Sequence, residues 1–115
     1  MQETNPSLRS VMIANGDQEK KIWATEFGAP TGGKPNPNPN PVTQQQQAKM
    51  VQDSYTLFNS YTWAGPLFWY TYIDPCTTTT DTECFFGLVH TDYSPKPAYD
   101  TYKNLAKNAG IPPTT

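Results

Sequence analysis

The stretch KIWATEFGAP, residues 21–30, decides how the rest of the chain is interpreted. Its first seven residues predict a short β-strand, and the glycine and proline that follow predict the end of that strand. Side chains alternate along a strand, so Glu26 should share a face with Ile22 and Ala24 at the carboxyl end. A carboxylate in that place can serve chemistry, or it can be an ordinary solvated residue at the start of a loop.

Composition narrows the classes of partner. The chain has 115 residues, which is enough for one small domain. Its formal net charge of −2, from 8 basic and 10 acidic residues, argues against nucleic acid or an anionic membrane as a partner. No apolar run approaches the ~20 residues of a membrane span. What stands out instead is the aromatic content of 13%, which is concentrated between Tyr55 and Phe86.

Three helices are predicted from their end signals. Asn5 and Pro6 indicate the start of the first helix, and the Asn15-Gly16 pair indicates its end. Thr43 and Gln46 form the capping box of a second helix, which runs to residue 60 with the glutamines at 44–47 as its polar first turn. For the third helix the predicted N-cap is Ser94, followed by Pro95, and the predicted stop is Gly110.

The second strand sets the topology. PLFWYTYI, residues 66–73, predicts a mostly buried strand. Between the two strands lie a proline-rich extended loop, residues 28–41, and the second helix, so the strands form a βαβ unit and should be parallel. Two strands and three helices cannot cover both faces of a parallel sheet. The chain is therefore predicted to be a piece of a larger α/β protein.

At this point the sequence resembles a known family. KIWATEFGAP looks like the seventh strand of the clan A glycoside hydrolases, and most closely the cellulase-like family 5 and the xylosidase-like family 39. GPLFWYTYIDP is similar to the eighth strand, and FFGLVHTDYSPKPAYDTY to the exit from that strand into the last helix. The resemblance implies an α/β fold in which residues 1–115 form the C-terminal segment of a (β/α)8 TIM barrel, its seventh and eighth βα units. As given, that barrel and its catalytic domain are incomplete.

The resemblance also implies a reaction. The complete enzyme would hydrolyse O-glycosyl bonds in carbohydrates by a retaining double displacement, with Glu26 of the T-E-x-G strand end as the nucleophile and with no metal or cofactor. An oligo- or polysaccharide substrate and the remaining barrel segment would be its partners. The loops 28–41 and 74–84 would rim the cleft, because both follow strand ends on the active-site face.

In the family, an aromatic residue at the end of the eighth strand forms the floor of the sugar-binding site. The spacing to Asp74 favours Tyr70 as that ring, with Trp69 as the second choice, and Tyr72 is a further candidate for substrate binding. For each of these rings the alternative is packing between the strand and the helices.

One part of the catalytic machinery is missing from the sequence. Retaining glycosidases use two carboxyl groups ~5–5.5 Å apart, one as nucleophile and one as acid and base. In the family the second group belongs to an Asn-Glu pair at the end of the fourth strand, and this chain contains no Asn-Glu pair. We therefore expect the isolated chain to be inactive.

Cys76 and Cys84 bracket a threonine-rich loop at a spacing that fits neither a redox C-x-x-C motif nor a zinc site. A disulfide between them is the preferred interpretation, which implies an oxidising compartment and a secreted or extracellular protein. Two unpaired thiols in a cytosolic chain are the alternative. His90 has no metal-ligand cluster around it in the sequence, so a surface or packing role is expected. Asp74 and Asp92 are expected to be turn or cap residues.

Two other function classes stay open at this stage. A non-catalytic carbohydrate-binding or structural secreted module could use the same aromatic strand as a stacking platform, without depending on Glu26. A small redox or nucleotide-binding domain is disfavoured, because no glycine-rich phosphate loop follows either strand and the cysteine spacing is wrong.

Overall fold

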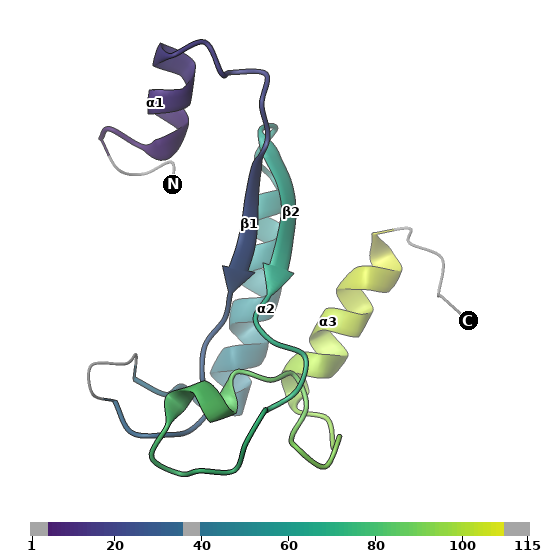
Figure 1. Ribbon diagram of the computed structural model, residues 1–115. Coiled ribbons are helices and arrows are strands. Elements are labelled where there is room, and N and C mark those ends of the chain that lie inside the picture. The colour runs from purple at the N-terminus through teal and green to yellow at the C-terminus, as the bar shows by residue number, and fades with distance from the viewer. Residues whose placement is uncertain (1–4, 36–39, 110–115) are drawn as a thin grey trace.

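The two predicted strands form a parallel pair. In the computed structural model, which describes residues 5–35 and 40–109, β1 (Ile22–Phe27) pairs with β2 (Ala64–Trp69) in a two-stranded parallel sheet. Helix α2 (Gln44–Asn59) connects them and lies along one face of the sheet (Figure 1). Ile22 is in register with Ala64 and Phe27 with Trp69, with irregularities between. The predicted βαβ unit is therefore present.

The second strand begins and ends earlier than residues 66–73. Tyr70 still donates its amide to the Phe27 carbonyl at 2.8 Å, but beyond it the chain leaves β1. Ile73 pairs instead with Val89, which also bridges to Pro95. The aromatic run therefore divides into a strand and an irregular segment that turns under the carboxyl ends of the sheet.

Helix α2 begins as predicted, while the other two helices begin later than predicted. Thr43 caps α2, and its side chain and that of Gln46 form the reciprocal capping box. Helix α1 (Leu8–Ala14) is capped by Ser7 rather than Asn5, because the Ser7 hydroxyl accepts from the Ser10 amide.

Helix α3 (Pro97–Asn108) has Lys96 at its N-cap rather than Ser94. Ser94 instead donates its amide to the Asp92 carboxylate in the preceding turn, so the predicted turn role of Asp92 is confirmed. The predicted stop of this helix at Gly110 lies outside the described residues.

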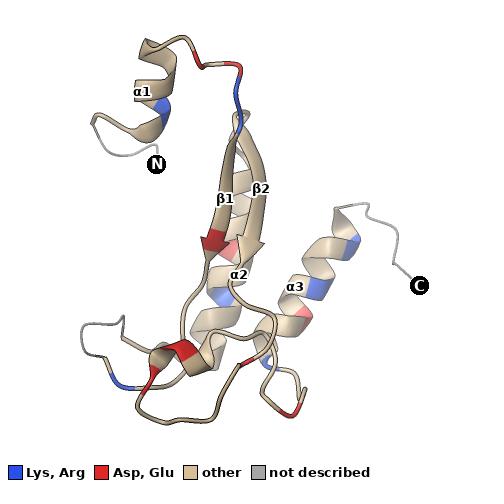
Figure 2. Cartoon of the chain, in the orientation of Figure 1, with Lys and Arg blue, Asp and Glu red and all other residues tan. Residues whose placement is uncertain are grey.

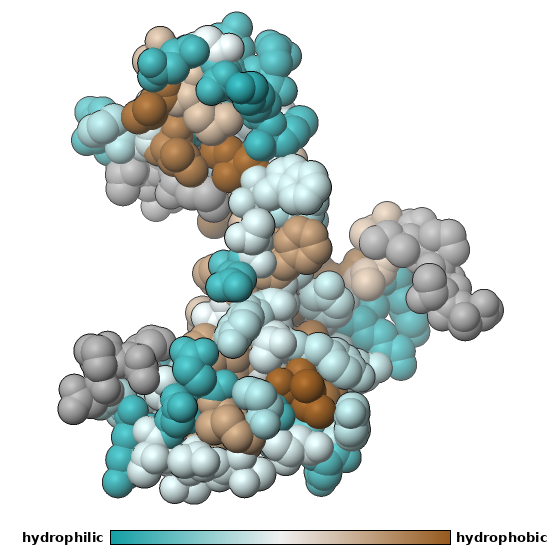
Figure 3. Space-filling model, viewed as in Figure 1, coloured by the Kyte–Doolittle hydropathy of each residue, from teal (hydrophilic) through white to brown (hydrophobic). Residues whose placement is uncertain are grey.

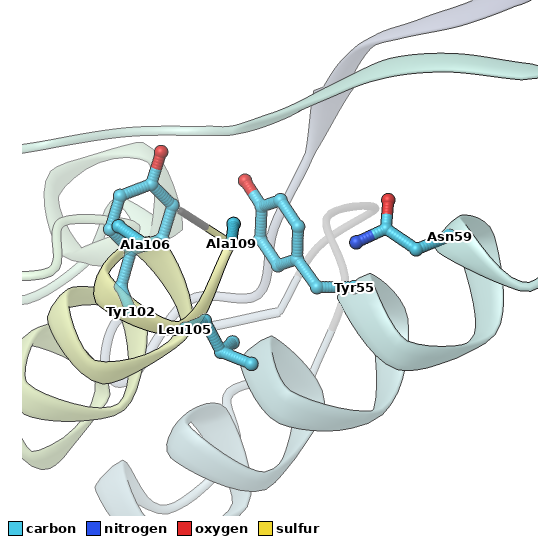
Figure 4. A pocket seen from close by; sticks show the side chains of 6 residues that line it. All are labelled: Tyr55, Asn59, Tyr102, Leu105, Ala106 and Ala109. Atoms are coloured by element: carbon cyan, nitrogen blue, oxygen red, sulfur yellow. The ribbon is translucent and has the colours of Figure 1, made fainter. Parts of the chain in front are cut away.

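Two apolar clusters hold the elements together. Ile22, Phe58 and Trp63 join the sheet to the end of α2. A second cluster of Val51, Leu88 and Ala98 joins α2, α3 and the segment between them. Tyr55 and Tyr102 extend this helix contact, their rings meeting edge to face at 5.5 Å beside a small pocket that opens between α2 and α3 (Figure 4).

Other apolar side chains stay at the surface. On the sheet, Trp23 is 62% exposed and Phe68 49%. Helix α1 has no buried residue, and apolar side chains reach the surface of that region in Figure 3. The structure is thus closed around the loops at the carboxyl ends of the strands and open along the sheet.

Candidate active site

Glu26 lies near the carboxyl end of β1, at the edge of the sheet where the loops that follow β1 and β2 begin. Its neighbour Phe27 is the last residue of the strand, and Gly28 follows. A Cβ atom on Gly28 would lie 2.1 Å from the Tyr70 carbonyl oxygen, so only glycine allows this approach. The glycine of the T-E-x-G motif therefore lets the segment after β2 pass directly beside Gly28, two residues after Glu26.

This crossing forms an open cleft of about 310 Å³. Its lining residues come from the end of β1, the end of β2 and the loop before α3: Glu26, Phe27, Gly28, Tyr70, Glu83 and Phe86. The predicted nucleophile and the preferred sugar-facing ring are thus brought together at one edge of a parallel strand pair, with α2 crossing between the strands.

Tyr70 is positioned by two contacts. Its ring meets the ring of Phe86 edge to face at 5.5 Å, and its hydroxyl donates to the Glu83 carboxylate over 3.4 Å. Loss of water around the ring, then the negative charge and hydrogen bond of Glu83, and then the charge of Glu26 raise the pKa of the Tyr70 phenol. At neutral pH the hydroxyl therefore keeps its proton and can donate a hydrogen bond.

The other two candidate rings lie outside the cleft lining. The indole of Trp69 donates to the Phe86 carbonyl at 3.3 Å, and its ring packs against the second apolar cluster and edge to face on Phe27. Tyr72 is 55% exposed. In this structure Trp69 connects β2 to the loop segment, whereas Tyr70 alone among the three lines the cleft with Glu26.

A buried ion pair fixes the loops that carry the cleft. Lys96 is fully buried and donates to Asp74 at 2.9 Å, to the Thr31 hydroxyl at 3.0 Å and to the Phe85 carbonyl at 3.2 Å. Burial lowers the pKa of the Lys96 ammonium, and the hydrogen bond and charge of Asp74 oppose that shift. All three ammonium donors are therefore satisfied, which is the condition for a stable buried charge.

Asp74 is more than the turn or cap residue expected from the sequence. Its side chain is 3% exposed and also accepts from the Gly87 amide at 2.7 Å. One carboxylate thus connects the segment after β2, the loop before α3 and the N-cap residue of that helix. Aspartate before proline is typical of turns, and no local pattern indicates that the Lys96 side chain contacts Asp74.

Gln47 is a second connection that the sequence analysis missed. It was explained there as part of a polar first turn, but it is fully buried. Its side-chain amide donates to the Ala29 carbonyl at 3.0 Å and to the Gly87 carbonyl at 3.3 Å. Helix α2 thereby contacts both loops below the cleft, and a single buried glutamine within a run of four is not distinguishable by pattern.

The predicted disulfide is present. Cys76 and Cys84 are bonded to each other, which closes the loop after β2. Within that loop a short helix, η1 (Thr82–Phe85), is capped by Asp81, and Gly33 at φ 91° packs its backbone against Thr82. Of the two loops predicted to rim the cleft, the described residues Gly28 of the first and Glu83 of the second line it.

Nothing in the described part of the chain forms a metal centre. In residues 5–35 and 40–109 no group of three or more His, Cys, Asp and Glu side chains is arranged to hold a metal ion. His90 is 40% exposed and lies between Gln44, at 3.4 Å, and the carboxylate of Asp74, at 3.7 Å. No helix among these residues is long and apolar enough to cross a bilayer.

No protein-family profile and no curated protein sequence matches the chain. Solved structures do match it. A family 39 glycoside hydrolase from the gut symbiont Bacteroides cellulosilyticus is similar over 92% of the chain, with 25% identity and a TM-score of 0.74.

Two further structures show the same fold. A GH5_18 protein from Bifidobacterium longum, in complex with Manb1-4GlcNAc, matches 84% of the chain at 19% identity with a TM-score of 0.67. A beta-glucuronidase from Ruminococcus gnavus matches 86% at 18% identity with a TM-score of 0.63. The chain spans 21%, 22% and 18% of these three proteins, which is about a fifth of their length.

The expected resemblance to glycoside hydrolases of families 39 and 5 is thus confirmed. The small α/β arrangement of this chain, with its parallel strand pair, is consistent with part of a TIM barrel.

Proposed function

We propose that this chain supplies the nucleophile strand of a retaining glycosidase, as the seventh and eighth βα units of a (β/α)8 barrel. The observation that carries the proposal is the position of Glu26. It stands at the carboxyl end of a parallel strand, in a cleft that it shares with Tyr70. In TIM barrels catalytic residues sit at this end of the strands.

The proposed reaction has two steps. The Glu26 carboxylate attacks the anomeric carbon, the bond from that carbon to the leaving oxygen breaks, and a carboxylic acid of the remaining barrel segment donates a proton to the leaving oxygen. The same partner then removes a proton from water, which displaces Glu26 and returns the anomeric carbon to its starting configuration. Tyr70 provides a ring beside the reacting sugar, and its hydroxyl oxygen, whose proton is donated to Glu83, can accept a hydrogen bond from a sugar hydroxyl.

The partners follow from this assignment. The substrate is an oligo- or polysaccharide, and the remaining barrel segment covers the open sheet around Trp23 and Phe68. We also propose that the protein is secreted, because the disulfide would be kept reduced in a cytosol.

Trapping the covalent intermediate tests the nucleophile directly. The complete barrel, with its remaining segment on the same chain or added separately, is treated with activated 2-deoxy-2-fluoro glycosides and digested for mass spectrometry. The expected result is one glycosyl group on the peptide that contains Glu26. Glu26→Gln should lower turnover of aryl glycosides by about 10⁴-fold or more, comparable to the loss of other members of a catalytic group.

Glu19→Gln is the matched control, because it removes an exposed carboxylate before β1, away from the cleft. It should leave turnover unchanged. A label on any other peptide, or hydrolysis that survives Glu26→Gln, would refute the assignment.

A further inference from the structure

Glu83 is a second carboxylate in the cleft, and the sequence analysis did not single it out. It lies in η1, inside the loop closed by the disulfide. Its amide donates to the Asp81 side chain at 3.0 Å, its neighbour Cys84 is disulfide-bonded, and the preceding Thr82 is fully buried. The backbone that carries Glu83 is therefore held on both sides, and its carboxylate reaches the Tyr70 hydroxyl from a fixed position.

The described residues that line the cleft carry net negative charge. Two of its lining residues, Glu26 and Glu83, are acidic, and none of its described lining residues is Lys, Arg or His. In Figure 2 acidic segments mark the end of β1 and the short helix of the loop. Lys96 is a buried cation that contacts the loops, but it does not line the cleft and its three donors are already bound within the protein.

Such a wall suits one kind of sugar. A carboxylate accepts hydrogen bonds from neighbouring hydroxyl groups of a sugar, and an aromatic ring stacks on its apolar face. A sugar that carries its own carboxylate would instead meet two like charges, and that repulsion is strong where water is displaced.

We propose that Glu83 is a specificity-determining residue that selects neutral sugars over uronic acids in the cleft. It binds hydroxyl groups of the sugar held at Tyr70 and repels a substrate carboxylate. This inference rests on the proposed function, since it assigns the sugar class that the same cleft accepts.

The test compares substrates that differ only at carbon 6. The complete barrel is assayed with pairs of 4-nitrophenyl β-glycosides in gluco, galacto and manno configuration, each pair consisting of the neutral sugar and its uronic acid. In the pair with the highest activity, kcat/KM should favour the neutral sugar by about 10-fold or more, the size expected for one like-charge contact at partial exposure. Glu83→Gln keeps the shape and a hydrogen-bond acceptor but removes the charge, so it should narrow this ratio by about 10-fold.

Two controls make the outcome decisive. Glu19→Gln removes another exposed carboxylate, outside the cleft, and should leave the ratio unchanged. Circular dichroism checks that each variant folds. Two results would overturn the role of Glu83 alone, provided that Glu26→Gln still abolishes activity. One is a wild-type preference for the uronic acid. The other is a ratio of neutral-sugar to uronic-acid kcat/KM that Glu83→Gln leaves unchanged. Activity that survives Glu26→Gln, or no turnover of any pair, would overturn the proposed function and this inference with it.

Discussion

The two ends of the parallel strand pair are built in opposite ways. At the carboxyl end, loops from three parts of the chain meet around the fully buried Lys96, the disulfide and a closed apolar cluster. Along the sheet and at α1, large apolar side chains such as Trp23, Phe68 and Ile13 are 49–62% exposed. The closed end supports its own geometry and carries the candidate site, whereas the open end needs a partner surface to cover it.

The largest effect on folding is expected from breaking the buried ion pair. Lys96→Met removes the cation and leaves the Asp74 carboxylate buried without its charge partner, so the free energy of unfolding should fall by about 3–5 kcal/mol. Equilibrium denaturation with urea measures the change. Lys49→Met is the matched control, because it breaks the exposed pair with Asp53 and should cost only about 0.3–0.5 kcal/mol.

A second variant separates charge from packing at this site. Adding Asp74→Leu to Lys96→Met removes the uncompensated charge and should restore part of the lost stability. Equal losses in Lys96→Met and Lys49→Met would show that the closed end does not depend on the ion pair, and the comparison between the two ends would fail.

The next effect concerns the disulfide, which belongs to the same closed end. Replacing Cys76 and Cys84 together by serine opens a loop with a sequence separation of 8, and should lower the free energy of unfolding by about 2–3 kcal/mol in the chain-entropy account. The measurement is urea denaturation without reductant, with thiol titration of the unfolded wild type as the check on pairing. Two reactive thiols in that titration would contradict the bond itself.

These contacts show where sequence reasoning succeeds and where it stops. Local signals were sufficient for β1, for the capping box of Thr43 and Gln46, for the parallel pairing and for the cysteine pair, since each depends on residues close in sequence or on chain connectivity. The starts of α1 and α3 and the extent of β2 were misplaced.

Long-range contacts explain most of these errors. Lys96 ends up at an N-cap position because its side chain is held by Asp74, 22 residues away. The aromatic run leaves β1 after Tyr70 because Val89 offers Ile73 another partner. At the candidate site, Glu26 and Tyr70 could be placed from topology, but Glu83 could not, because only the folded loop brings it to the Tyr70 hydroxyl. No local pattern encodes any of these contacts.

Self-association of the chain, rather than its unfolding, tests whether the exposed sheet needs a partner surface. Expressed alone, the chain should self-associate through the uncovered sheet, and Trp23→Thr should weaken the association about 10-fold, which corresponds to about 1–2 kcal/mol for one ring left in water. Analytical ultracentrifugation over a concentration series measures it.

A ring outside the sheet provides the control for this change. Tyr93 is 69% exposed in a turn at φ 66°, which asparagine tolerates, so Tyr93→Asn removes a comparably exposed ring without affecting the sheet. Equal weakening by both variants, or a monomeric wild type at all concentrations, would show that the sheet is not the surface that needs covering.

The smallest effect comes from one motif that occurs at both ends. Helix α2 and helix α1 each begin with a reciprocal capping box, formed by Thr43 with Gln46 and by Ser7 with Ser10. Removing the capping hydroxyl costs about 1 kcal/mol when the helix must form for the protein to fold. Helix α2 packs on the sheet and on α3, so Thr43→Ala should lower the global free energy of unfolding by that amount. Helix α1 has no buried residue beyond its N-cap Ser7, and only Met12 packs on the first apolar cluster, so Ser7→Ala should change the global free energy of unfolding by less than about 0.5 kcal/mol. Its effect should appear instead as faster hydrogen exchange of the α1 amides alone, because a weakly attached helix opens without unfolding the rest.

Equal losses in the global free energy of unfolding in the two variants would mean that α1 is as firmly integrated as α2. The open end would then extend over the sheet face only and would not include the first helix.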